Sequence, residues 1–300
     1  MQIKSIKKTI QAKLDDWLES ITDKSLRDAV KDHLLVSGGS ITSLFLGEPV
    51  NDYDIYLQNR SVLLRLVKYY TNGHNDVSIL DGEFRQQYID EYKGRFSDHD
   101  FAKHQGKRAS ALRNLREDQV KIYIEGSNGG LKVDINPEKK YQVSFFSPNA
   151  ISLTDDIQIV IRFHGKPEDI HKTFDFVHAT NYFTYAAGVV TNLAAAESIL
   201  TKQLKYQGSL YPLTSVIRSK KFVKRNWNIN AGELLKMMFQ ISMLDLTDMD
   251  TLEEQLIGVD VAYFETLIKA LRGKQENEPE FKITPEYFNA LIDKIFNDLD

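Results

Sequence analysis

Two aspartates on one short segment are the residues best suited to chemistry in this sequence. Asp52 and Asp54 lie in the run DYDIYL, whose apolar residues predict a strand over 54–57. On a strand, the side chains at positions i and i+2 project from the same face. Two like charges held that close repel each other unless a cation lies between them, and Mg²⁺ prefers carboxylate oxygens as ligands. The pair therefore predicts a site for a divalent metal, Mg²⁺ or Mn²⁺.

A glycine-rich turn precedes the two aspartates. Leu34–Val36 predicts a short buried strand, and Gly38, Gly39 and Ser40 follow it closely. The two glycines permit a tight turn, and Ser40 can cap the short helix expected over 41–46. Because backbone N–H groups at the start of a helix attract anions, the turn is suited to phosphate groups. The turn and the aspartates together describe one site for a nucleoside triphosphate such as ATP.

The order of these two features resembles the DNA-polymerase-β-like nucleotidyltransferase superfamily. Its hallmark is an apolar residue, then Gly-Gly or Gly-Ser, then a short segment and Asp-x-Asp on a strand. The resemblance implies that a nucleoside monophosphate is transferred from an NTP to an acceptor hydroxyl by two metal ions, with pyrophosphate leaving. Asp52 and Asp54 would bridge both metals. Gly38, Gly39 and Ser40 would hold the triphosphate.

The resemblance also implies a third carboxylate on a neighbouring strand, and two positions compete for that role. Asp175 lies among the bulky residues of FDFVH, where a charge needs a metal or a partner. Asp134 lies in LKVDI, an alternation typical of an ordinary half-exposed strand. We favour Asp175, which would bind the catalytic metal and orient the acceptor, and Asp134 is the alternative. The choice requires the polar region over about 81–118 to be an insertion.

A basic segment with interleaved aromatic residues lies further along the chain. Between Lys202 and Arg225 there are seven basic residues and no acidic one. Such a segment can neutralise phosphates, and rings such as those of Tyr206 and Trp227 can stack on a base. This composition favours RNA as the acceptor. The resemblance suggests four of the cations as contacts to the nucleotide: Lys202, Lys205, Arg218 and Lys221.

The predicted elements indicate an α+β protein, with a nucleotidyltransferase-type mixed β-sheet and flanking helices, followed by an all-α C-terminal domain. We expect the catalytic domain over 1–180 and the helical domain over 181–300. Apolar residues at four-residue spacing predict an amphipathic helix over 3–20. Strands are expected over 120–124 and 131–135, joined into a hairpin by GSNGG, and over 141–146, 157–163 and 174–178. Helices are expected over 193–207, 232–244, 261–271 and 285–299, with the Met- and Leu-rich face of the second in the core.

The composition excludes several classes of protein. The 300 residues include no Cys, which excludes a disulfide framework, a thiolate zinc site and a cysteine nucleophile. No apolar run approaches the roughly 18–20 residues that span a bilayer, so we expect a cytoplasmic protein with no membrane partner.

Two hypotheses of different classes follow. In the first, the chain is a catalytically competent, metal-dependent nucleotidyltransferase whose acceptor is an RNA or tRNA, or a protein hydroxyl as in toxin-like members of the superfamily. In the second, it is a catalytically inactive nucleotidyltransferase fold that acts as a binding or interaction module. The intact Asp52, Asp54 and Gly-Gly-Ser turn argue for the enzyme, because an inactive site usually loses an acid.

Overall fold

The computed structural model describes residues 2–93, 111–112, 115–127, 130–256, 262–278 and 280–296. The chain forms two compact units, each with a hydrophobic core of its own. The first unit comprises Met1–His171 and Ala179–Ala195, and the second comprises Lys172–His178 and Ala196–Asp300. Part of the insertion expected over about 81–118 lies outside the described residues.

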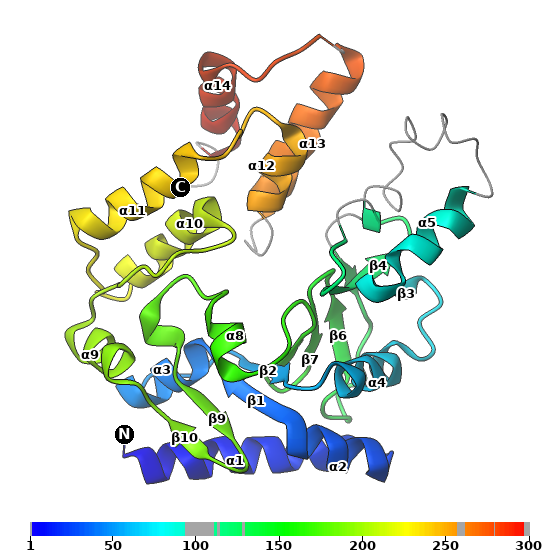
Figure 1. The fold of residues 1–300 in the computed structure, drawn as a ribbon, viewed down its shortest axis with the longest axis vertical. Helices are drawn as coiled ribbons and strands as arrows, with labels where there is room; N and C mark the ends of the chain where they lie inside the picture. Colours follow the sequence, from blue (N-terminus) through cyan, green and yellow to red (C-terminus); the bar gives the residue numbers. More distant parts are fainter. Residues whose placement is uncertain are drawn as a thin grey trace. The chain divides into compact units, whose positions relative to one another are not determined.

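The N-terminal helix is confirmed. α1 (Ile3–Ser20) buries the face that the four-residue spacing predicted, and Trp17 joins that face. α2 (Lys24–His33) follows at once, because the side chain of Asp23 caps its first turn by accepting a hydrogen bond from the N–H of Leu26. Figure 1 shows these two helices in blue, next to the first strands of the sheet.

The first unit is built around an eight-stranded mixed sheet (Figure 1). The strands lie in the order β10-β9-β1-β2-β8-β7-β6-β5. Every neighbouring pair is antiparallel except β2 and β8, which run parallel. Their bounds are β1 Leu34–Ser37, β2 Tyr53–Leu57, β5 Leu131–Lys132, β6 Val143–Phe146, β7 Ala150–Leu153, β8 Ile157–Val160, β9 Tyr182–Thr184 and β10 Gly188–Val190.

One face of this sheet forms the core of the first unit. Val36 of β1, Ile55 of β2 and Ile159 of β8 lie side by side across the sheet and are completely buried. They pack in one cluster with apolar residues of α1 and α4 (Arg60–Thr71). Because side chains alternate along a strand, the residues adjacent to them in the sequence face the other side of the sheet.

The prediction of a hairpin between 120–124 and 131–135 is wrong. β4 (Val120–Ile124) pairs instead with β3 (Val77–Asp81) as a separate two-stranded sheet, and β5 pairs with β6. The β3–β4 pairing extends over five residue pairs and buries Val120 and Ile122. A glycine-rich turn fixes where a strand ends, but the burial of its apolar face decides which strand it joins.

The strand expected over 174–178 is also wrong. Only Phe176 forms a bridge, with Tyr206, and Val177–Ala179 form a short 3₁₀ turn. Beyond residue 181, where we expected helices throughout, β9 and β10 extend the sheet of the first unit. The sequence also did not predict β7.

The second unit is helical, which confirms the α+β class with a C-terminal helical region. α9 (Leu193–Thr201) begins in the first unit and ends in the second. Met249, Leu252, Leu267 and Leu271 are central to the core of the second unit. All four helices expected in this part of the chain are present: α9, which ends at Thr201 and not at 207, α11 (Ala231–Ser242), α13 (Ala262–Asn277) and α14 (Pro285–Phe296). α10 (Pro212–Val223) and α12 (Met249–Gln255) were not predicted.

The Met- and Leu-rich face of α11 is not the core face that we expected. Met237 is completely buried, but Leu235, Met238 and Phe239 are 64%, 59% and 72% exposed. α11 packs against α10. Its apolar residues occupy more of the helix circumference than one neighbouring helix covers, so a stripe of them faces outward.

None of the described helices combines the length and the apolar character that a bilayer crossing requires.

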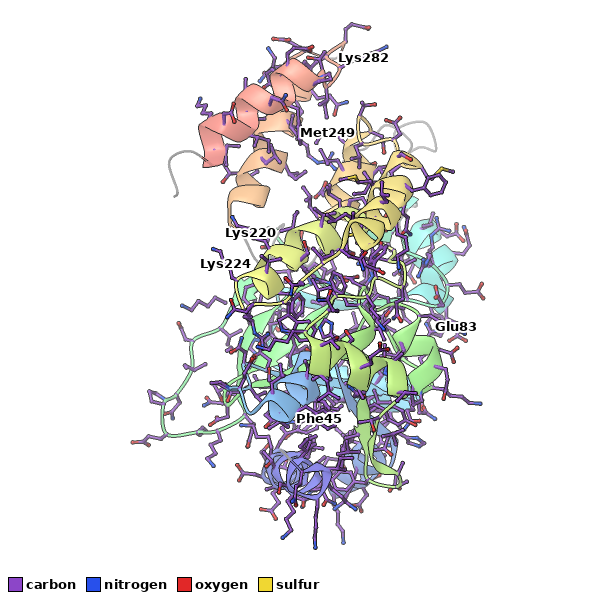
Figure 2. All side chains as sticks on the ribbon, turned by 90° about the vertical axis from the view of Figure 1, so that its left-hand side faces the viewer. Phe45, Glu83, Lys220, Lys224, Met249 and Lys282 are labelled. Atoms are coloured by element: carbon purple, nitrogen blue, oxygen red, sulfur yellow. The ribbon has the colours of Figure 1, made fainter. Side chains whose placement is uncertain are left out.

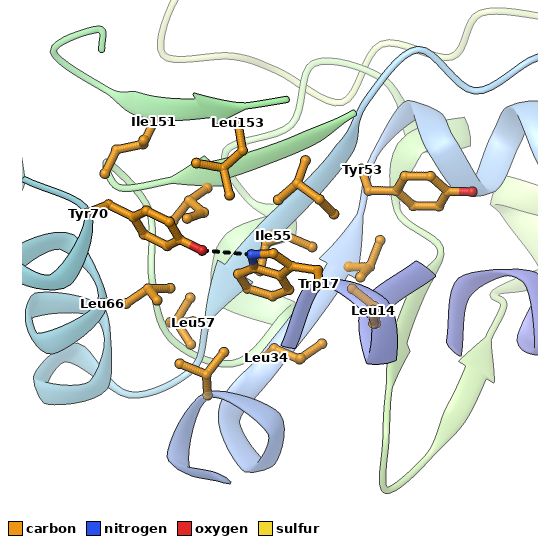
Figure 3. Packing of buried hydrophobic residues seen from close by; sticks show 14 of the residues in the cluster. Leu14, Trp17, Leu34, Tyr53, Ile55, Leu57, Leu66, Tyr70, Ile151 and Leu153 are labelled. Carbon is orange, nitrogen blue, oxygen red and sulfur yellow. Dashed lines mark hydrogen bonds between the residues drawn. The ribbon is translucent and has the colours of Figure 1, made fainter. Parts of the chain in front are cut away.

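A buried hydrogen bond links α1 to α4 inside the first core (Figure 3). The indole Nε1 of Trp17 donates to the hydroxyl oxygen of Tyr70 at 3.0 Å. Trp17 is completely buried and Tyr70 nearly so, and burial raises the pKa of the Tyr70 hydroxyl. The bond therefore gives the only polar atom of the Trp17 ring an acceptor in an apolar environment.

The change Tyr70→Phe should lower the free energy of unfolding by about 1–3 kcal/mol, because it leaves the Trp17 N–H buried without its acceptor. The matched control is Tyr69→Phe, whose hydroxyl accepts an exposed hydrogen bond from the N–H of Thr22 at 3.2 Å. That change should cost less than about 1 kcal/mol. Urea unfolding of the two variants measures the difference, and equal losses would contradict the role given to the Trp17–Tyr70 bond.

Candidate functional site

The glycine turn at the end of β1 is the first part of the site. Gly38 has φ 93° and ψ −148°, a backbone conformation that essentially only glycine adopts. Its N–H donates to the carbonyl oxygen of Ala179 at 3.1 Å. α3 (Gly39–Leu46) begins immediately after it, so Gly38, and not Ser40 as we expected, lies at the N-cap position.

The turn and the second aspartate lie against each other. A Cβ atom on Gly38 would be 3.0 Å from Oδ2 of Asp54. The pairing of β1 with β2 sets this approach, because it places Ser37 directly opposite Asp54. Gly38 therefore lacks a side chain for two reasons, its positive φ and the proximity of a carboxylate. Asp52 lies just before β2 and is exposed, while Asp54 is half-buried.

The hydroxyl of Ser40 is the second unusual feature at this turn. Ser40 is 2% exposed, and its Oγ has no hydrogen-bond partner among the described residues. Buried hydroxyls normally have a partner. An unsatisfied donor in the first turn of a helix, beside backbone N–H groups and the positive end of the helix dipole, fits an anionic ligand such as phosphate.

The residues beside Asp54 on the two neighbouring strands are both neutral. Ser37 of β1 and Gln158 of β8 are its register partners, so the three side chains lie in one row on the face opposite the core. Reasoning from the sequence missed both neighbours. Ser37 adjoins the glycine turn, which is a local signal, whereas only the pairing of β2 with β8 identifies Gln158.

His171 forms a hydrogen bond with Ser37, the first residue of this row. Oγ of Ser37 lies 2.9 Å from Nε2 of His171 and 2.8 Å from the carbonyl oxygen of Asn181. The hydroxyl has one proton, which it donates to a carbonyl, so it accepts the second bond from the imidazole N–H. Burial lowers the pKa of His171, which keeps the ring neutral. α8 (Pro167–His171) thus holds Ser37 in place beside Asp54.

The structure does not bring Asp134 next to Asp54. Asp134 follows β5 at the edge of the sheet and is exposed. β8, β7 and β6 separate β5 from β2, which amounts to roughly 19 Å at about 4.8 Å per strand. No group of three or more Asp, Glu or His side chains that could hold a metal occurs in the part of the chain that the structure describes.

Asp175 belongs to the second unit and is paired there. Its Oδ1 accepts a hydrogen bond from the hydroxyl of Ser209 at 2.7 Å, and its Oδ2 accepts one from Arg218 at 2.8 Å. The carboxylate is 7% exposed, while the Arg218 side chain is 42% exposed. The buried negative charge of Asp175 is therefore compensated within the second unit. Part of this compensation comes from Arg218, one of the cations that we expected to contact the nucleotide.

The other three cations that we expected to contact the nucleotide also lie in the second unit. Lys205 forms an ion pair with Glu197 at 2.7 Å, and Lys202, at a positive φ of 49°, is half-buried. Lys221 is exposed near the end of α10. Figure 2 shows the nearby Lys220 and Lys224 extending outward from the end of this helix.

The aromatic residues of the basic segment do not form the stacking surface that we expected. Tyr206 and Trp227 are 4% and 2% exposed, so neither ring is open to a base. The rings of Phe222 and Trp227 each lie 4.6 Å from the ring of His178, and Phe176 lies 5.9 Å from it. These aromatic side chains form a packed cluster around His178.

The environment of His178 disfavours its charged form. Burial lowers the pKa of His178 to about 3, and the positive charge of Arg225 acts in the same direction. The histidine is therefore neutral at physiological pH, and protonating it would place a charge inside the aromatic cluster.

A comparison with protein families matches residues 8–202 to the model of Gad2, described as "Gabija anti-defense 2 family protein". The chain belongs to the Gabija anti-defense 2 family. The match covers more than half of the 300 residues and includes the Gly38 turn, Asp52, Asp54 and Gln158. The candidate site of the first unit therefore lies in the part of the chain that defines the family. None of the curated proteins matches the chain.

Among solved structures, this Gabija anti-defense 2 chain shows distant similarity to CCA-adding enzymes. The enzyme from Thermotoga maritima, complexed with tRNA, has a TM-score of 0.37 and 13% identity over 91% of this chain and 57% of that one. A CCA-adding enzyme with CTP has a TM-score of 0.37 and 14% identity, over 96% and 62% of the two chains. A tRNA nucleotidyltransferase with a primer tRNA and an incoming ATP analog has a TM-score of 0.36 and 11% identity, over 89% and 73%. The chain thus spans little more than half the length of the Thermotoga enzyme.

The change Gly38→Ala should lower the free energy of unfolding by about 1–3 kcal/mol, because alanine is strained at this φ and ψ. The added Cβ would also press on the Asp54 carboxylate. The matched control is Gly39→Ala, where a Cβ meets no atom within 4 Å and alanine favours the helix. Denaturant unfolding compares the two variants. Equal stability of both would show that the turn does not require glycine at Gly38.

Protonation of His178 should make the protein less stable in acid. The unfolded chain binds this proton below a pKa of about 6.5, but the folded chain binds it only below about 3. The free energy of unfolding should therefore fall as the pH decreases from 6.5 toward 3, by about 2 kcal/mol at pH 5. Unfolding measured at pH 7 and pH 5 should show a smaller loss in His178→Phe than in the wild type. His33→Gln serves as the control, and an unchanged loss in His178→Phe would contradict the prediction.

Proposed function

We propose that this chain is a metal-dependent nucleotidyltransferase that transfers a nucleoside monophosphate from an NTP to an acceptor hydroxyl. The observation that carries the proposal is the approach of the Asp54 carboxylate to Gly38, at 3.0 Å from the position of a Cβ atom. A carboxylate that can bind a cation thus lies next to the start of a helix, where an anion can bind. This combination fits a ligand that carries both, namely a nucleoside triphosphate with its metal.

The glycine turn would bind the phosphates. The N–H groups of Gly39 and Ser40 belong to the first turn of α3 and have no carbonyl partner within the helix. The Ser40 hydroxyl is the unsatisfied donor at the same place. A phosphate oxygen bound here would accept these hydrogen bonds and benefit from the helix dipole, while the absence of a side chain at Gly38 permits the close approach.

Asp52 and Asp54 would hold the metal. Both offer hard oxygen atoms, and Asp54 lies beside the turn that would bind the phosphates. A bound Mg²⁺ or Mn²⁺ would neutralise charge on the triphosphate and on the leaving pyrophosphate. The protein residues would fix the nucleotide and the acceptor in position, and no protein nucleophile is required.

The exposed cations of α10 and the residues after it favour RNA as the acceptor. Lys220, Lys221, Lys224 and Arg225 are all exposed, and no acidic residue lies among them. Clustered cations of this kind bind phosphate backbones in a salt-dependent manner. Since Tyr206 and Trp227 are buried, this preference depends on charge and not on base stacking. The family name suggests that the acceptor is a molecule on which the Gabija defence depends.

Transfer of label from an NTP should depend on the two aspartates. The full chain is incubated with each α-labelled NTP, Mg²⁺ or Mn²⁺, and either total RNA or total protein. Asp52→Asn and Asp54→Asn should each reduce transfer by about 100-fold or more, because each removes a charge that stabilises the reacting complex. Glu125→Gln, at an exposed acid just after β4, should leave transfer unchanged.

The same experiment tests the alternative of an inactive binding module. No transfer by the wild type, together with equal NTP affinity in the wild type and the aspartate variants, would overturn the enzyme proposal. Label that appears in protein instead of RNA would move the acceptor to a protein hydroxyl.

Asp175 as the third carboxylate is also a proposal, and its ion pair allows a specific test. To bind a metal ion, the Asp175 carboxylate would have to give up its ion pair with Arg218. Asp175→Asn should then abolish transfer, and the loss of the Arg218 ion pair should also lower the unfolding midpoint. Retained transfer with a lower midpoint would assign Asp175 to the Arg218 ion pair alone.

A further inference from the structure

Asp54 has one neighbour in its row that can still act as a ligand. The row places Ser37 on one side of Asp54 and Gln158 on the other, with all three side chains on the face opposite the core. Neither neighbour carries a charge. Any ion held by Asp54 therefore has neutral oxygen atoms as its closest additional ligands along this row.

The hydroxyl of Ser37 already has hydrogen-bond partners inside the protein. Ser37 is completely buried, and its hydroxyl lies within hydrogen-bond distance of His171 and of the carbonyl oxygens of Ala179 and Asn181. These contacts use its donor and an acceptor site. To bind an ion, Ser37 would have to give up this buried network.

Gln158 is oriented differently. Its Nε2 donates to the hydroxyl of Ser152 on β7 at 3.4 Å. Ser152 is the register partner of Gln158 on the side away from β2. Because the two polar atoms of an amide point in different directions from the terminal carbon, this bond turns Oε1 away from β7. The other neighbour of β8 is β2, which carries Asp54.

We propose that Gln158 is a further metal ligand, which binds through Oε1 beside the carboxylate of Asp54. The inference rests on the proposed function, since it concerns the ion that Asp52 and Asp54 would hold. It does not depend on Asp175, because Gln158, Asp52 and Asp54 all belong to the first unit. Neighbouring strands lie about 4.8 Å apart, and glutamine is one methylene longer than aspartate, so both side chains can reach one ion.

The neutral ligand has a consequence for charge. Amide carbonyl oxygens serve as ligands for hard cations but add no negative charge. With Gln158, this part of the site carries the two charges of Asp52 and Asp54 and no third. Metal affinity should therefore be lower than a carboxylate at position 158 would give, and it should rise when a triphosphate adds its own charge.

The test is Mn²⁺ binding by the full chain, followed by the electron paramagnetic resonance signal of the free ion, with and without a non-hydrolysable NTP analogue. Gln158→Leu removes the oxygen atom at similar size and should weaken Mn²⁺ binding by about 10-fold or more. Gln158→Glu supplies a charged oxygen in its place and should strengthen binding in the absence of nucleotide. Gln86→Leu, at an exposed position on α5 (Arg85–Lys93), is the matched control and should bind Mn²⁺ as the wild type does.

Asp54→Asn separates this inference from the proposed function. Unchanged Mn²⁺ affinity in Asp54→Asn would overturn the metal site itself. Weaker binding in Asp54→Asn together with wild-type affinity in Gln158→Leu would overturn only the role of Gln158. If thermal melting shows that Gln158→Leu does not fold, Gln158→Glu decides the question, because affinity equal to that of the wild type contradicts a ligand at this position.

Discussion

The close approach of the Asp54 carboxylate to the side-chain position of Gly38 is the constraint on which the candidate site depends. A Cβ at Gly38 would lie 3.0 Å from Oδ2 of Asp54, and the φ of 93° would strain any other residue there. The pairing of Ser37 with Asp54 fixes the distance between the two strands at this point. The direction of α3 follows from the same turn, because the helix begins at Gly39. One backbone conformation therefore sets both the place of the carboxylate and the direction of the helix start.

One face of β1, β2 and β8 contributes to the core, and the opposite face carries the residues of the candidate site. Val36, Ile55 and Ile159 face the core, and the residues next to them in the sequence face the opposite side. A slip of the register by one residue would bury the carboxylate of Asp54 and expose Ile55. The large apolar cluster that includes Trp17 and Tyr70 therefore holds the polar row in register.

Charge in the second unit shows why a buried acid is an ambiguous signal. Asp175 lies among apolar residues, as a metal ligand in a strand would, yet Arg218 and Ser209 satisfy both of its oxygen atoms. An ion pair and a metal both compensate a buried carboxylate, so the sequence pattern alone does not distinguish them. The same reasoning applies to Tyr206 and Trp227, since aromatic residues between lysines are as suited to a packed cluster as to a base-stacking surface.

Local signals in the sequence predicted the elements that depend on neighbouring residues, and they failed where distant strands meet. The spacing of apolar residues located α1, and Gly38 and Gly39 located the turn before α3. The predicted partner of β4 was wrong because pairing with β3 accompanies the burial of Val120 and Ile122 in the core of the first unit, which outweighs a nearby glycine-rich turn. Gln158 carries no local signal at all, since glutamine in a strand is unremarkable until the parallel pairing of β8 with β2 places it beside Asp54. The residues next to Asp54 are thus determined by strand order, which a single sequence encodes only through the burial that the whole sheet achieves.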